Sequence, residues 1–71
     1  MKTKFKLGQR LLWDNGYSYS IVEYIGPSIF EGSERVVREN NPDLDVIVVD
    51  SIDLYEYSLE QESYLKLKYD L

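Results

Sequence analysis

The chain has 71 residues, neither cysteine nor histidine, and a net charge of −5. A chain this short buries only ~60% of its unfolded surface, so we expect residues 1–71 to form one small domain of modest stability. Without cysteine the chain has no disulfide or thiolate site, and without histidine it lacks the commonest transition-metal ligand. A domain of this size also rarely encloses a pocket in which paired carboxylates would have the shifted pKa that catalysis needs. We therefore expect neither an enzyme nor a cofactor.

The amino-terminal residues 2–7 alternate lysines with Thr3, Phe5 and Leu7, which indicates a half-buried strand or an extended lead-in. After Gly8, residues 9–13 (QRLLW) are predicted to form the first full strand. The next three residues, DNG, favour a tight hairpin because Asn-Gly suits positive φ at consecutive positions. Residues 17–25 are predicted to be the longest strand, with a bulge or bend near residues 21–22, where the apolar periodicity slips.

A loop over residues 28–34 follows Gly26-Pro27, and we expect its Ile29 and Phe30 to cover one end of the core. Residues 35–38 are predicted to form a short strand, and residues 39–43 a turn rich in Asn, Pro and Asp. Residues 46–49 (VIVV) are β-branched throughout and apolar on both faces. This run predicts a central strand that is buried on both sides.

Residues 50–53 predict a single 3₁₀ turn, and residues 54–57 a short strand with the two tyrosines on one face. The tail over residues 59–71 is open to two interpretations. Ser58 and Gln61 match a capping box, and Glu62 with Lys66 is a favourable helical pair. Alternation of apolar and charged residues over positions 65–71 favours a strand instead. We prefer the helix slightly.

This order of elements resembles the SH3-like small barrels, the group that includes SH3, Tudor and KOW-type domains. Residues 5–11 (FKLGQRL) are similar to the F-x-x-G-(D/Q)-x-(V/L) opening of many such barrels, and residues 48–54 (VVDSIDL) to their closing strand and 3₁₀ turn. The resemblance implies a mainly β fold: a five-stranded barrel over residues 5–58 with residues 59–71 as an appended tail.

Barrels of this group that bind ligands use aromatic side chains between the strand 1–2 and strand 3–4 connections. Trp13, Tyr17 and Tyr19 flank the first connection here, and residues 40–45 form the second. With a nearby acid such as Asp14, these rings would make a cage for methylated lysine or arginine. The same spacing is also what the core of a hairpin requires, and we prefer this structural role of the three rings to the cage. Proline-rich ligand binding has little support, because the acidic loop of SH3 domains has no counterpart beyond Glu31 and Glu34.

The charges are unevenly distributed along the chain. Basic side chains cluster at the two ends, whereas residues 11–65 contain two bases and twelve acids. Concentrated charge of one sign serves solubility or steers an oppositely charged partner. We predict a non-enzymatic interaction module that binds a basic surface of a partner protein. The candidate contact residues are Asp43, Asp45, Asp50, Asp53, Glu56, Glu31, Glu34, Trp13, Tyr17 and Tyr19.

Two other functions fit small size and acidity. An acidic inhibitor would present carboxylates in place of the phosphates of a nucleic acid. A nucleic-acid-binding barrel is the third choice, since the twelve acids oppose phosphate binding. A calcium site over residues 40–45 would lack the glycine and the distal Glu of a calcium loop, so we expect no metal. Because the longest apolar run has four residues and no apolar signal segment is seen, we expect a soluble, cytoplasmic protein.

Overall fold

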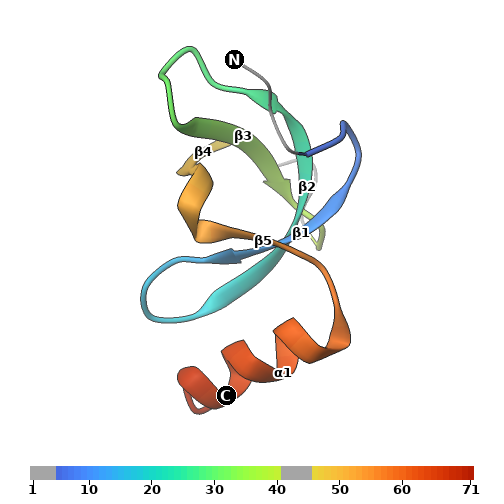
Figure 1. Cartoon of the computed structure of the whole chain (residues 1–71), viewed down its shortest axis with the longest axis vertical. Helices are drawn as coiled ribbons and strands as arrows, with labels where there is room; N and C mark the ends of the chain where they lie inside the picture. The colour runs from blue at the N-terminus through green and yellow to red at the C-terminus, as the bar shows by residue number, and fades with distance from the viewer. Residues whose placement is uncertain (1–4, 41–45) are drawn as a thin grey trace.

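A computed structural model describes residues 5–40 and 46–71 of the chain. Five strands form one antiparallel sheet, and a helix follows the last of them (Figure 1). The elements are β1 (Arg10–Asp14), β2 (Tyr19–Pro27), β3 (Ser33–Arg38), β4 (Ile47–Asp50), the 3₁₀ turn η1 (Ser51–Asp53), β5 (Leu54–Glu56) and α1 (Leu59–Lys68). A mainly β fold with a 3₁₀ turn before the last strand is thus confirmed.

The sheet is rolled without being closed into a barrel. Its strand order is β4-β3-β2-β1-β5, which places β4 and β5 at opposite edges. In a flat sheet those edges would lie roughly 19 Å apart, at ~4.8 Å per strand. The three residues of η1 join them directly, and a 3₁₀ turn rises only ~2 Å per residue. The connection therefore requires a strong roll, although the described residues form no ladder between β4 and β5.

The core fills the concave face of this rolled sheet. Strand alternation places Leu11 and Trp13 of β1 on the same face as Val22 and Tyr24 of β2. The buried cluster consists of Phe5, Leu11, Val22, Tyr24, Val36, Val49 and Leu54, with Trp13 and Ile47 packed against it. Residues 5–9 form no strand, but Gly8 donates a backbone hydrogen bond to Tyr24. The N–H of Gln9 donates to the carbonyl of Lys6 at 3.0 Å, so a turn follows the buried Phe5, and no strand is present in the described part of the predicted amino-terminal segment.

The helix α1 lies against the convex face of β1 and β2 (Figure 1). Leu65 on α1 and Leu12 on β1 are both fully buried and lie outside the concave cluster. The Ser58 hydroxyl accepts a hydrogen bond of 3.0 Å from the backbone N–H of Gln61, as the capping box predicts. The helical interpretation of the tail is confirmed, and the alternative strand is wrong.

The run over residues 46–49 was predicted to be a central strand buried on both sides, and this is wrong. Because β4 lies at the edge of the rolled sheet, only Val49 is buried, whereas Val46 and Val48 are about half exposed, at 47% and 54%. β-Branched residues favour a strand but carry no information on how many neighbours it has. A charge at Val48 would face solvent and would not enter the core.

Two turn predictions also need correction. The irregularity in β2 lies between Tyr24 and Gly26, not near residues 21–22. Gly26 has φ +134°, and a Cβ at this position would lie 3.0 Å from the guanidinium of Arg35. The β1–β2 hairpin is present, but with a four-residue loop in which Gly16 alone has positive φ. The side chain of Asn15 supports this loop by accepting the N–H of Ser18 at 2.7 Å.

Candidate functional site

The β2–β3 loop and η1 are joined by hydrogen bonds. The backbone N–H of Ser51 donates to the carbonyl of Gly32 at 2.9 Å, and the Ser51 hydroxyl donates to a carboxylate oxygen of Glu34 at 2.5 Å. The other oxygen of Glu34 accepts the hydroxyl of Tyr24 at 2.7 Å. Only 8% of Glu34 is exposed. Glu34 therefore anchors η1 to the core and is not a surface contact residue.

This junction places acidic and apolar side chains on one surface, which we call the η1 face. Its residues are Ile29, Phe30, Glu31, Asp50, Ile52 and Asp53. Ile29 is 94% exposed, Ile52 81% and Phe30 65%, so the loop residues do not cover the core as predicted. Asp50 precedes η1, but its side chain forms no capping hydrogen bond. Neither residues 28–32 nor residues 50–53 contain a lysine or arginine. The acids of the η1 face are therefore uncompensated within these segments.

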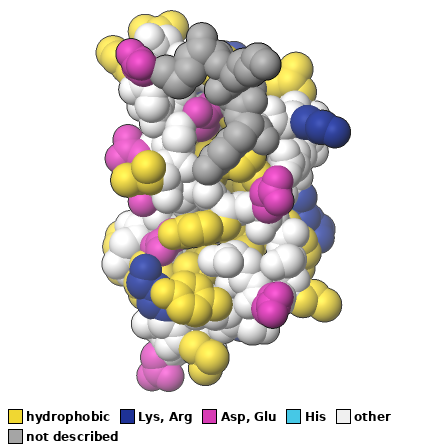
Figure 2. Space-filling view, in the orientation of Figure 1, with side chains coloured by type: hydrophobic (Ala, Val, Ile, Leu, Met, Phe, Trp, Pro, Cys, Tyr) yellow, Lys and Arg dark blue, Asp and Glu magenta, His cyan; other side chains and the backbone are white. Residues whose placement is uncertain are grey.

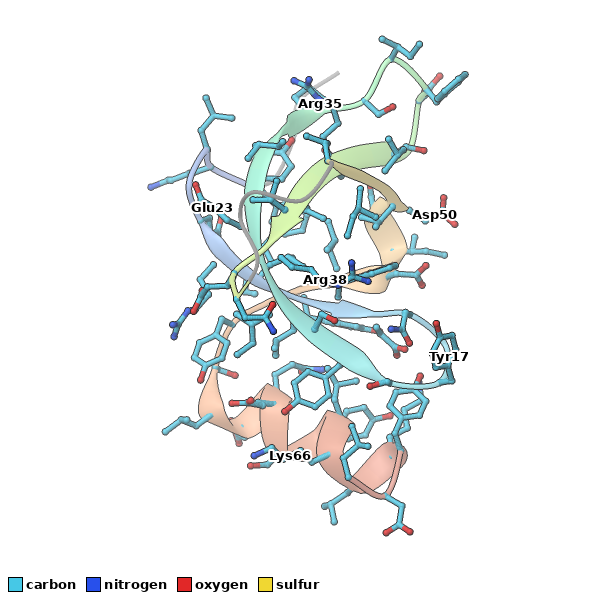
Figure 3. The ribbon with its side chains drawn as sticks, turned by 180° about the vertical axis from the view of Figure 1, so that it is seen from behind. Tyr17, Glu23, Arg35, Arg38, Asp50 and Lys66 are labelled. Carbon is cyan, nitrogen blue, oxygen red and sulfur yellow. The ribbon has the colours of Figure 1, made fainter. Side chains whose placement is uncertain are left out.

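The hairpin tip lies beside the η1 face. Tyr17 is 79% exposed, and Figure 3 shows it on the same side of the molecule as Asp50. A hollow of about 400 Å³ connects the two regions, lined by Asp14, Asn15, Gly16, Asp53, Lys68 and Tyr69. Acidic and hydrophobic side chains also gather along the upper left margin of the space-filling view (Figure 2). The edge of the molecule is thus mixed in character, as a protein contact surface is.

Asp14, considered above as a cage acid, is occupied within the fold. Its carboxylate accepts hydrogen bonds from the Tyr69 hydroxyl, from the Gly16 N–H at 3.0 Å and from the Lys68 ammonium at 3.0 Å. Burial acts to raise the pKa of Asp14, but these hydrogen bonds outweigh it and leave the pKa below its ordinary value. Asp14 therefore fastens the hairpin to the end of α1.

The predicted rings do not converge on a cage. Trp13 is paired with Ser20 on the concave face, where the guanidinium of Arg38 lies 5.6 Å from its ring centroid. Tyr19 lies on the convex face and donates its hydroxyl to Glu62 at 2.8 Å. Burial, followed by the Glu62 hydrogen bond, raises the pKa of Tyr19 to about 12. Trp13 and Tyr19 therefore point to opposite sides of the sheet.

The remaining predicted acids are separated. Glu56 is exposed on β5 and lines a different hollow with Phe5 and Gln61. Asp43 and Asp45 lie outside the described residues. Sequence reasoning did not identify Ile52 as an exposed apolar residue, although a single Ile between acidic residues in a 3₁₀ turn was a visible signal. It also missed Arg38 on Trp13, which no local pattern reveals because the two residues lie on different strands.

The described parts of the chain contain no group of three or more acidic side chains arranged to hold a metal ion. In the same residues, no helix has the length and apolar character needed to cross a membrane. Comparisons of the chain with protein-family models, curated proteins and solved structures found no match. The functional argument therefore rests on the geometry of the η1 face and its surroundings.

Proposed function

We propose that this domain is a non-enzymatic interaction module that binds a basic, partly apolar surface of a partner protein through the η1 face. The observation that carries the proposal is the pairing of the β2–β3 loop with η1, at 2.9 Å between Ser51 N and Gly32 O. This contact brings the loop and η1 together, with two exposed acids, the half-buried Asp53 and three exposed apolar side chains. Exposed carboxylates steer a basic partner, and apolar side chains supply the area that is desolvated on binding.

An SH3-like fold is part of the proposal. It is supported by the strand order, by a 3₁₀ turn that joins the two edge strands, and by the opening residues 5–11. Fold likeness by itself says nothing about the ligand, so the choice of partner chemistry comes from the side chains of the η1 face.

The test compares two variants with the same change in charge. The first neutralises the η1 face with E31Q, D50N and D53N. The second neutralises three exposed acids elsewhere, with E23Q, E56Q and E60Q. Immobilised wild-type and variant domains are used to capture proteins from a cell lysate, which mass spectrometry identifies. Association of the main captured protein is then measured by stopped flow at several salt concentrations.

We expect the η1-face variant to bind about tenfold more weakly, with slower association and a flatter salt dependence, because steering by exposed charge is lost. The second variant should resemble wild type. Equal retention of the captured protein by both variants, or loss in the second alone, would contradict the assignment. Capture of a nucleic-acid-binding protein that nucleic acid displaces would favour the inhibitor alternative.

A further inference from the structure

A second, separate region contains Arg38, which forms no ion pair with another described residue. At the mouth of the concave face, Trp13 of β1 is directly opposite Ser20 of β2, and Val22 of β2 is directly opposite Arg38 of β3. Ser20 and Arg38 are therefore diagonal neighbours on one face, within reach of each other's side chains. The Arg38 guanidinium lies over the Trp13 ring at 5.6 Å. This contact holds the cation in place, and among the described residues no hydrogen bond uses its N–H donors.

The neighbouring acid does not neutralise Arg38. Glu39 instead accepts two hydrogen bonds from the guanidinium of Arg10, at 2.7 and 2.5 Å. Arg10 also lies over the ring of Tyr57, 4.8 Å from its centroid. Within residues 5–40 and 46–71, no carboxylate accepts a hydrogen bond from Arg38.

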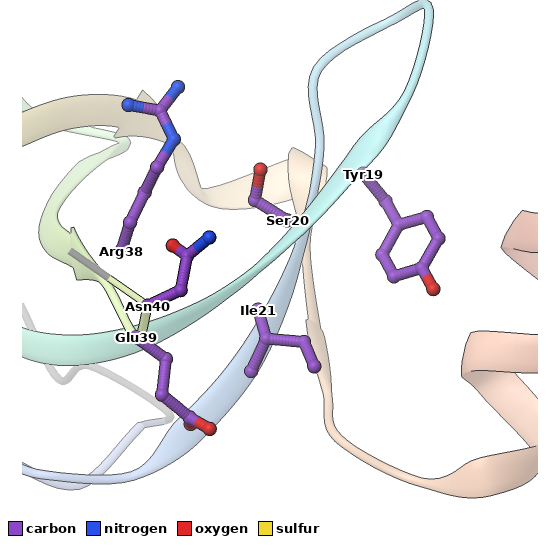
Figure 4. Close-up of a pocket in the computed structure, with 6 residues that line it drawn as sticks. All are labelled: Tyr19, Ser20, Ile21, Arg38, Glu39 and Asn40. Carbon is purple, nitrogen blue, oxygen red and sulfur yellow. The ribbon is translucent and has the colours of Figure 1, made fainter.

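A hollow of about 440 Å³ adjoins Arg38. Its lining residues are Tyr19, Ser20, Ile21, Arg38, Glu39 and Asn40. Figure 4 shows the side chains of Arg38, Ser20 and Asn40 on the same side of β2, with Ile21 and Glu39 turned away from them. A guanidinium, a hydroxyl and an amide are all hydrogen-bond donors. Three donor side chains thus border one open depression.

We propose that this depression, with Ser20, Arg38 and Asn40 as its donors and Trp13 behind the Arg38 guanidinium, is a binding site for a carboxylate group of a peptide. A guanidinium presents paired N–H donors that match the two oxygens of a carboxylate. One Arg balances one negative charge, so a singly charged carboxylate fits better than a doubly charged phosphate, which the acidic surroundings would repel. The site is distinct from the η1 face and does not depend on its function.

The carboxylate can come from a chain terminus or from an acidic side chain, and small probes distinguish these sources. N-acetylglycine represents a terminal carboxylate, N-acetylglutamate α-amide a side-chain carboxylate, and N-acetylglycinamide is the neutral control. Because Trp13 is the single tryptophan of the chain, its fluorescence reports on the site directly. Titrations at constant ionic strength are followed by this fluorescence and by the amide NMR shifts of Ser20 and Asn40.

We expect saturable binding of at least one carboxylate probe and no response to the neutral amide. R38Q should weaken binding by about tenfold, as expected on loss of a charge-assisted hydrogen bond, and R38K should fall between R38Q and wild type because it keeps the charge without the paired donors. The matched control is R35Q. Arg35 also lies on β3 but is exposed and donates to the carbonyl of Pro27. R35Q should bind as wild type does.

Three results would overturn the proposal. They are the absence of saturable binding in the wild type, an equal response to the neutral amide, and equal weakening by R38Q and R35Q. The NMR spectra of each variant also report its folding, so a loss of binding is interpreted only for a folded domain. If both carboxylates bind, the tighter probe identifies the source that the site prefers.

Discussion

The convex face under α1 and the η1 face contain similar side chains but use them differently. Beneath α1, the hydroxyls of Tyr19 and Tyr57 both donate to Glu62, and Asp14 accepts from Lys68 and Tyr69. On the η1 face, exposed acids stand beside exposed apolar residues. Acids that are already hydrogen-bonded hold the fold together, whereas acids without a structural role are available to a partner.

The largest expected difference between the two regions concerns apolar side chains. L65A should lower the free energy of unfolding by about 2–4 kcal/mol, because Leu65 is the fully buried residue of α1 and its truncation leaves a cavity. I52A on the η1 face should change it by less than about 0.5 kcal/mol, since Ile52 is 81% exposed. Urea denaturation followed by circular dichroism measures both. Similar values for the two variants would mean that α1 does not cover a second core.

A smaller difference is expected between two aspartates. D14N should destabilise the domain by about 1–3 kcal/mol at neutral pH, because a buried carboxylate with several donors is replaced. D50N should be close to neutral, as Asp50 makes no capping bond. Since the folded-state pKa of Asp14 is lowered, its contribution is present above the ordinary carboxyl pKa and is lost as the pH falls through the lowered one. The difference in free energy of unfolding between wild type and D14N should therefore decrease below about pH 4. A difference that does not change with pH would contradict a stabilising role of the ionised Asp14 carboxylate.

The smallest expected effect is the alkaline response of the helix contact. The pKa of Tyr19 is raised to about 12, so its contribution to stability is complete below the ordinary tyrosine pKa of about 10 and is lost as the pH rises through about 12. The free energy of unfolding, measured at several pH values from about 9 to about 12, should fall in wild type as Tyr19 ionises. The fall should be smaller in Y19F. Y17F, which alters an exposed ring at the hairpin tip, is the control. An identical alkaline profile for Y19F and wild type would remove Tyr19 from the interface.

Comparison with the sequence predictions separates local from long-range information. The hairpin, η1 and the start of α1 were predictable because each depends on residues close in the chain. Gly16 supplies the positive φ of the hairpin, and Ser58 and Gln61 cap the helix. Three acids of the η1 face, Glu31, Asp50 and Asp53, were also named from charge alone. Their shared surface depends on the contact between Ser51 and Gly32.

The sequence by itself thus determined where the strands, the 3₁₀ turn and the helix form, since propensity and capping act over a few residues. Only the tertiary structure decided that β4 is an edge strand, that Glu34 is buried and that Asp14 is paired. Burial and ion pairing arise between strands and a helix that are distant in the chain. The free energies of burial and pairing depend on which side chains come into contact. A local sequence pattern does not specify these long-range contacts. It therefore cannot distinguish an acid that is hydrogen-bonded within the fold from one that is exposed to solvent.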